Sequence, residues 1–296
     1  MGDPRGASFF NLRAYEFYLI SILLPETEKP YEFERMSLYL DLMDDDEQGL
    51  EEKFDDAVSI IRENYKDIDD ATLEMKKSNR GRNYFDYIVT TPSERFGIEI
   101  KQSKYKTGSD SVESQIQYEV LFDLLLEKIT RPHDNERFKQ ELRTIKRTLK
   151  KYNADGVRWS DITYERSEFA RSVAVPARKL LKEMAQYLRY YDTGLMPVLW
   201  EYLYGTPIWR VTITPEDTIT TYLDVGDIWS KHIPEIVDAP NSLAFSEMND
   251  ECSVKLRLHS SSTKVSISSF VAGISFDFTK ILRDPNYFTF IFNRTD

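Results

Sequence analysis

The sequence predicts an α/β protein in which a mixed central sheet is flanked by helices, with a helical insertion and a β-rich C-terminal part. Three observations lead to this fold class. Apolar residues recur at helical spacing before residue 65 and again between 131 and 192. Two runs of aromatic and β-branched residues, 84–91 and 96–103, form a hairpin pattern, and strand-forming runs dominate 196–296.

The N-terminal region is expected to be mainly helical. Residues 9–24 read as an amphipathic helix that ends before Pro25, because charged residues interrupt the apolar run and a membrane span needs about 20 apolar residues. A second helix is expected over 50–65, and a short strand over 72–75. The apolar stripe of the second helix consists of Leu50, Phe54, Val58, Ile61 and Tyr65.

The hairpin is the most informative part of the sequence. Its two runs are separated by Pro92-Ser-Glu-Arg95, which contains the residue types that favour turns. A helix is then expected over 111–128, where apolar residues recur at helical spacing. The expected order is therefore helix, strand, hairpin and helix.

The second half of the chain changes from helices to strands. Residues 137–151 carry seven Lys or Arg against one acid, with an apolar stripe of Phe138, Leu142, Ile145 and Leu149, so they predict a basic amphipathic helix. A further helix is expected over 175–191. Strands are then expected at 198–204, 208–213, 254–258 and 274–278.

Composition narrows the classes of function. The formal net charge is −11, which argues against indiscriminate coating of a polyanion such as DNA but leaves room for local basic contacts. The single cysteine, Cys252, excludes a disulfide framework and a multi-cysteine zinc site, and the three histidines have no ligand spacing. We therefore expect a cytoplasmic protein that is not inserted in a membrane.

One group of charged residues on the hairpin could carry chemistry. Side chains alternate between the faces of a strand, so Glu99 and Lys101 point the same way. A tight turn around Ser93-Glu94 would place Asp86 opposite Lys101 and one pleat from Glu99. Opposite and diagonal neighbours lie roughly 5–8 Å apart, so two carboxylates and an ammonium would share one patch.

Such a patch suits hydrolysis of a phosphodiester. Two carboxylates can hold Mg²⁺, and a lysine can activate water or stabilise negative charge on phosphorus. Glu-x-Lys occurs three times in the chain, but only the copy at Glu99 lies in an apolar strand with an Asp-bearing partner. The alternative is an exposed amphipathic hairpin with a surface ion pair.

These residues resemble the PD-(D/E)XK nuclease superfamily, which includes most Type II restriction endonucleases. The resemblance covers roughly 50–128, although Phe85 stands where the family name has proline. It implies a restriction-endonuclease-like core in which Asp86 and Glu99 bind metal and Lys101 is catalytic. It also implies a carboxylate on the preceding helix, either Glu51 or Asp55, and a glutamine helper, Gln115 or Gln117.

The expected function is Mg²⁺-dependent cleavage of double-stranded DNA, most like that of a Type II restriction enzyme acting as a homodimer. Alternatives are a repair, transposition or other defence nuclease without fixed sequence specificity, and a non-enzymatic binding protein. The expected domains are a nuclease core over 1–130, a helical insertion with DNA contacts over 131–195, and a β-rich part over 196–296 that completes the core sheet, recognises DNA, or both. The expected DNA contacts are Lys76, Lys77, Arg80, Arg82, Lys104, Arg143, Arg147 and Lys150.

Overall fold

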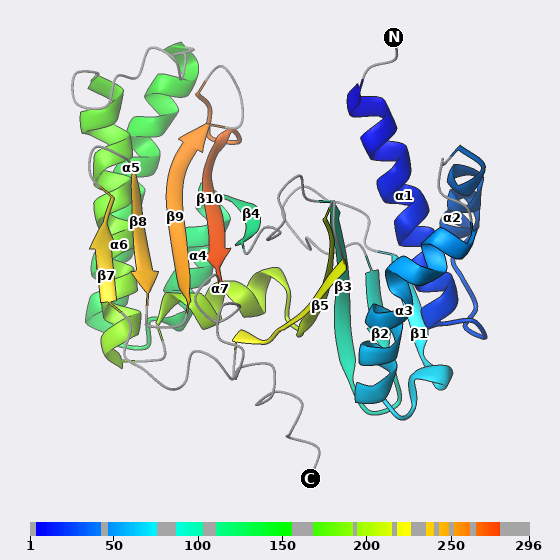
Figure 1. Cartoon of the computed structure of the whole chain (residues 1–296). Coiled ribbons are helices and arrows are strands. Elements are labelled where there is room, and N and C mark those ends of the chain that lie inside the picture. The colour runs from blue at the N-terminus through cyan, green and yellow to red at the C-terminus, as the bar shows by residue number, and fades with distance from the viewer. Residues whose placement is uncertain are drawn as a thin grey trace. The chain divides into compact units, whose positions relative to one another are not determined.

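The computed structural model describes residues 4–42, 47–75, 87–102, 111–155, 168–191, 194–214, 218–225, 235–239, 243–248, 252–260 and 265–278. The chain forms two compact units (Figure 1). Unit 1 contains the described residues of 1–109 and 204–224, and unit 2 contains those of 110–203 and 225–293. The chain therefore leaves unit 1, returns to it for two strands, and leaves it again.

Unit 1 is built on a mixed five-stranded sheet in the order β1-β2-β3-β5-β6. Strands β2 and β3 form the expected hairpin, and β5 lies parallel to β3 while every other pair is antiparallel. The mixed sheet confirms the coarse fold class. Its strands are β1 (Thr72–Met75), β2 (Tyr87–Thr90), β3 (Arg95–Gln102), β5 (Ile208–Ile213) and β6 (Thr218–Leu223).

Helices pack on one face of this sheet. Phe33 contacts Tyr87 edge to face, and Tyr65 stacks on Phe96 with ring centroids 4.2 Å apart. The indole N–H of Trp209 donates to the hydroxyl of Tyr65 at 3.0 Å. The helical elements are α1 (Pro4–Leu23), α2 (Tyr31–Glu34), η1 (Arg35–Leu42), α3 (Glu47–Asn64) and η2 (Ile68–Asp70). The apolar stripe predicted for α3 is confirmed at four of its positions, since Leu50, Phe54, Ile61 and Tyr65 are buried.

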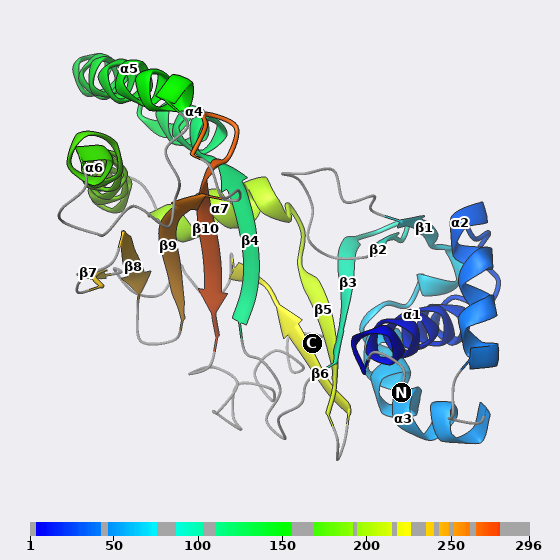
Figure 2. The same ribbon diagram turned by 90° about the horizontal axis from the view of Figure 1, so that it is seen from above.

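Unit 2 contains an antiparallel five-stranded sheet in the order β4-β10-β9-β8-β7. Its strands are β4 (Ser111–Gln117), β7 (Glu235–Asp238), β8 (Ala244–Met248), β9 (Ser253–Ser260) and β10 (Phe270–Asp277). Its helices are α4 (Tyr118–Lys128), α5 (Pro132–Asp155), the π-helical turn η4 (Ala170–Ala174), α6 (Val175–Tyr191) and α7 (Leu195–Leu203). Figure 2 shows α4, α5 and α6 on one side of this sheet.

A buried carboxylate begins helix α7. Oε2 of Glu247 accepts the backbone N–H groups of Leu195 and Met196, at 2.6 and 3.0 Å. Its Oε1 is buried and has no hydrogen-bond partner among the described residues. Burial raises the pKa of Glu247 from its ordinary value near 4.5 to about 7, against the lowering effect of the two N–H groups and of Arg189.

Two expected elements are corrected by the structure. Residues 111–117 form strand β4 and not the first two turns of a helix, because Ser114 and Ile116 are buried while Gln115 and Gln117 are exposed. The strand expected over 198–204 is instead helix α7, where an apolar run too short to show a clear period is buried on several sides.

The three consecutive ranges expected as domains, 1–130, 131–195 and 196–296, differ from these two units, and their separate roles stay a prediction. Strands β5 and β6 join the sheet of unit 1, whereas α5 and α6 belong with the strands of unit 2. In the described ranges, no helix is both long enough and apolar enough to cross a bilayer.

Candidate active site

Strand β3 separates an apolar face of the unit 1 sheet from a polar face. Ile98 is paired with Tyr87 and Trp209, and all three belong to the face covered by helices. Glu99 and Lys101 have the opposite parity, so they share the polar face, as the sequence predicted.

Glu99 is held by two cations. The Nε–H of Arg210 donates to its Oε2 at 2.9 Å, and the Nζ of Lys101 lies 3.4 Å from its Oε1. The side chains of Arg210 and Glu99 are 3% and 9% exposed, whereas that of Lys101 is 32% exposed. Glu99 and Arg210 therefore form a buried ion pair with Lys101 at its accessible end.

The register of the sheet places Arg210 beside Glu99. In the parallel pair β3–β5 the two residues are direct partners, and Arg210 is in turn paired with Thr221 of β6. Thr212, the partner of Lys101, is also on this face. Arg210, Thr212 and Thr221 are all buried. A row of buried polar side chains thus crosses three strands on the polar face of the sheet.

Sequence reasoning missed Arg210, although a signal for it was present. It is the one charged residue in Ile208–Ile213, a strand that is buried throughout. A guanidinium cannot shed its charge, so in such a strand it requires a paired anion. A buried arginine predicts a carboxylate partner but does not identify it, because 111 positions separate Arg210 from Glu99 in the sequence.

Asp86 lies outside the described residues, so its predicted place in the site stays a prediction. The register that supported it is corrected. Tyr87 pairs with Ile98 and not with Ile100, because the turn closes where the N–H of Thr91 donates to the carbonyl of Glu94 at 2.8 Å. A shift of two residues keeps the parity of every side chain, so the face expected for Glu99 and Lys101 is unaffected.

The third carboxylate was expected on α3, at Glu51 or Asp55. Both side chains are exposed, because Leu50 and Phe54 occupy the side of the helix that faces the core. In the part of the chain that the structure describes, no three His, Cys, Asp or Glu side chains form a group that could hold a metal ion. The oxygens of Glu99 suit Mg²⁺ by type, and Asp86, the other predicted ligand, lies outside the described residues.

The glutamines expected as helpers lie on a strand and not on a helix. Gln115 and Gln117 are on β4 of unit 2, paired with Gly273 and Val271 of β10, and not on a helix that follows β3. This corrects the element on which they were placed. Their expected helper role stays a prediction.

The basic helix exists as predicted. In α5 the apolar residues Phe138, Leu142, Ile145 and Leu149 are buried, and Arg143, Arg147 and Lys150 are exposed. Lys76, Lys77, Arg80, Arg82 and Lys104, the other expected DNA contacts, lie outside the described residues.

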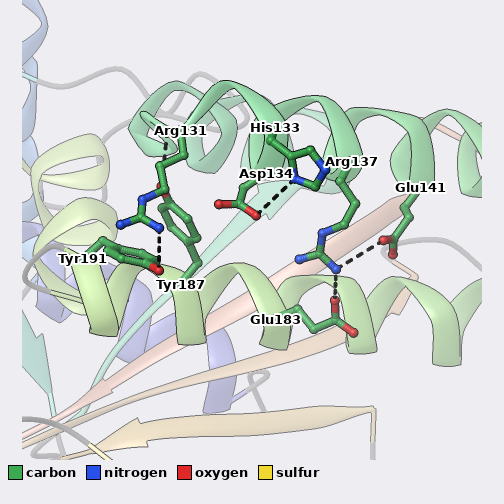
Figure 3. Close-up of polar contacts among 8 residues, drawn as sticks. All are labelled: Arg131, His133, Asp134, Arg137, Glu141, Glu183, Tyr187 and Tyr191. Carbon is green, nitrogen blue, oxygen red and sulfur yellow. Dashed lines mark hydrogen bonds and ion pairs between the residues drawn. The ribbon is translucent and has the colours of Figure 1, made fainter.

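Acidic partners neutralise part of the charge on α5. A guanidinium nitrogen of Arg137 lies 3.6 Å from a carboxylate oxygen of Glu141, on the same helix, and 3.0 Å from one of Glu183, on α6 (Figure 3). Lys146 faces Glu119 at 3.5 Å, and Arg143 faces Glu136 at 3.3 Å. Arg147 and Lys150 have no ion-pair partner within the described residues.

Comparisons with known proteins add nothing to this geometry. No protein-family model matches the chain. No curated protein matches it either.

Proposed function

We propose that this protein is a Mg²⁺-dependent endonuclease that hydrolyses phosphodiester bonds of DNA. The observation that carries the proposal is the charged group on β3, in which Glu99 is buried beside the more accessible Lys101 on the polar face of the sheet. Burying a charged side chain is costly unless it is paired, so a buried carboxylate on this strand requires the cations that surround it. The order α3, β1, β2, β3 agrees with the first four elements that the family resemblance implies, whereas strand β4 follows β3 where the resemblance implies a helix.

Each residue has a distinct task in this proposal. Glu99 and Asp86 would hold the metal ion, which when bound supplies a Lewis acid and lowers the pKa of a water molecule. Arg210 holds Oε2 of Glu99 and so fixes the direction of the carboxylate. Lys101 keeps a positive charge at the accessible end of the pair, where it would stabilise negative charge developing on the phosphate.

The subclass that we propose is a Type II restriction enzyme. Cutting both strands of a palindromic site requires two active sites related by a two-fold axis, so the expected assembly is a homodimer. Light scattering on the full chain with and without DNA measures this directly, and a monomer under both conditions would contradict it.

The test is digestion of a plasmid in Mg²⁺ or Mn²⁺, with a chelator as the blank. Lys101→Ala should reduce cleavage by at least 100-fold, the size expected for loss of one group that stabilises transition-state charge, while DNA binding in Ca²⁺ persists. Lys66→Ala, which removes an exposed lysine of the same unit, is the matched control. Cleavage by Lys101→Ala within a few-fold of the wild type would remove Lys101 from the mechanism.

The same digest separates the alternatives. Discrete bands indicate fixed sequence specificity, whereas a smear indicates a repair, transposition or other defence nuclease. A non-enzymatic binding protein is favoured by one observation, which is that cations engage both oxygens of Glu99. Under that alternative no metal-dependent cleavage occurs, and Mn²⁺ gives no thermal protection that Asp86→Asn or Glu99→Gln abolishes.

A further inference from the structure

The sheet of unit 2 is covered by helices on one face. Tyr118 of α4 contacts Phe270, Trp200 of α7 contacts Phe276, and Glu247 reaches the start of α7. The register pairs Phe276 with Val254 and Val254 with Glu247, so these contacts all involve the same face. Residues of the other parity form the opposite face.

That opposite face, which we call the open face, is polar and exposed at its centre. On β9 the buried Val254, Leu256 and Leu258 alternate with the exposed Lys255 and Arg257. On β4 the exposed residues are Gln115 and Gln117. The register brings Gln115, Gly273 and Arg257 into one row, and Gln117, Val271 and His259 into the next.

The cations of the open face resemble Arg147 and Lys150 of α5 and differ from the paired cations of the helical layer. Arg137 and Lys146 are paired with carboxylates, as described above. Lys255 and Arg257 have no ion-pair partner within the described residues. Two positions of β9 that share this face, separated by one residue, therefore carry positive charge without a direct ion pair in the described residues.

Small residues lie next to the cations of β9 on the open face. A Cβ at Gly273 would lie 3.1 Å from Nε2 of His259, so the glycine makes room for the imidazole above it. Ser246 is the neighbour of Lys255 on β8, and Ser275 is its neighbour on β10. Small residues therefore flank Lys255 on both neighbouring strands, whereas the imidazole of His259 occupies the space above Gly273.

The residue types select the kind of ligand. No Phe, Tyr or Trp lies on the open face in the strands as described, because their aromatic side chains have the parity of the covered face. Proteins that bind single-stranded nucleic acid stack bases on such rings, and protein interfaces are enriched in them. Arginine, lysine and glutamine instead contact the phosphates and base edges of duplex DNA.

We propose that the open face is a docking surface for duplex DNA, held by Lys255 and Arg257 through phosphates and by Gln115 and Gln117 through amide hydrogen bonds. The proposal rests on the proposed function for its choice of polyanion. The acids of this face, Asp277 and Glu235, occupy the row beyond Lys255, and Glu113 is level with Lys255 on β4. The duplex is therefore placed toward the Arg257 and His259 end.

The experiment measures binding and leaves cleavage aside. Fluorescence anisotropy of a labelled duplex is followed against salt concentration, with Ca²⁺ in place of Mg²⁺, for the full chain and for Lys255→Gln/Arg257→Gln. Both residues are exposed, so the variant should fold. We expect affinity to fall roughly tenfold and the slope of log K against log salt to flatten by about 1.8, since each lost phosphate contact removes about 0.9.

The matched control is Lys179→Gln/Arg171→Gln, which removes two exposed cations from the helical layer and changes the net charge equally. It should change affinity less than two-fold. Gln115→Ala/Gln117→Ala should alter the preference among duplex sequences while leaving the salt slope unchanged. Equal losses in the two cation variants would reduce the effect to net charge and overturn the proposal, as would tighter binding of a single strand than of a duplex.

The outcomes keep the two proposals apart. Cleavage by the wild type, together with duplex binding that Lys255→Gln/Arg257→Gln leaves intact, overturns the docking surface and supports the nuclease. Duplex binding that depends on Lys255 and Arg257, without any metal-dependent cleavage, supports the docking surface and overturns the nuclease.

Discussion

Replacing Arg210 by Met should destabilise the protein strongly, because it leaves the carboxylate of Glu99 buried without its closest partner. Two unit charges about 4 Å apart attract by roughly 4 kcal/mol at an effective dielectric of about 20, and burying each ion costs several kcal/mol. The intact pair therefore contributes little net stability. The single variant loses the attraction and keeps the cost for Glu99, so we expect a loss of about 3–5 kcal/mol.

The double variant Arg210→Met/Glu99→Gln tests this reasoning. It removes both charges, so most of the lost stability should return, leaving a deficit of about 0–2 kcal/mol from imperfect packing and hydrogen bonding. Lys101, which is 32% exposed, can only partly replace Arg210 because solvent screens it.

Urea unfolding followed by tryptophan fluorescence measures both variants, since Trp209 adjoins Arg210 on β5 and is buried. The midpoint should shift without a change in the m value. A cost below about 1 kcal/mol for Arg210→Met is typical of an exposed ion pair and would refute the argument. A double variant no more stable than the single one would refute it as well.

The remaining predictions concern unit 2. Replacing Arg143, Arg147 and Lys150 of α5 together by Gln should flatten the slope of log K against log salt for DNA binding by up to about 2.7, if this helix contacts phosphates. The control is Arg137→Gln, because Arg137 is already paired with Glu183. An unchanged slope would exclude α5 as a DNA contact. Because the pKa of Glu247 is raised from about 4.5 to about 7, its stabilising contribution is present below pH 4.5 and is lost as the pH rises through 7. Relative to Glu247→Gln, the wild type should therefore lose roughly 3 kcal/mol of unfolding free energy between pH 4.5 and 8, and parallel pH profiles would contradict this. Gly194→Ala should cost roughly 1–3 kcal/mol in thermal unfolding, since φ is +100° and a Cβ would lie 2.9 Å from Oε1 of Glu247; a cost near zero would show that this turn relaxes.

Local patterns were sufficient for much of the fold. The limits of β1, α6 and β5 agree with the expected ranges, and α6 shows a clear helical period. The face shared by Glu99 and Lys101 also followed from the sequence, since the period of a strand does not depend on its partners. A short apolar run such as 198–203 could not be assigned in this way, because burial on several sides removes the period that separates a helix from a strand.

The sequence by itself determined which residues share a face, and the tertiary structure decided which faces meet. Glu99 could be placed on the polar side of its strand, but its pairing with Arg210 arises from the parallel contact of β3 with β5 across 111 positions. Likewise β4 is a strand because its backbone N–H and C=O groups pair with those of β10, more than 150 positions later in the chain. Pairing between distant strands depends on the burial that the whole chain achieves, which no local period encodes.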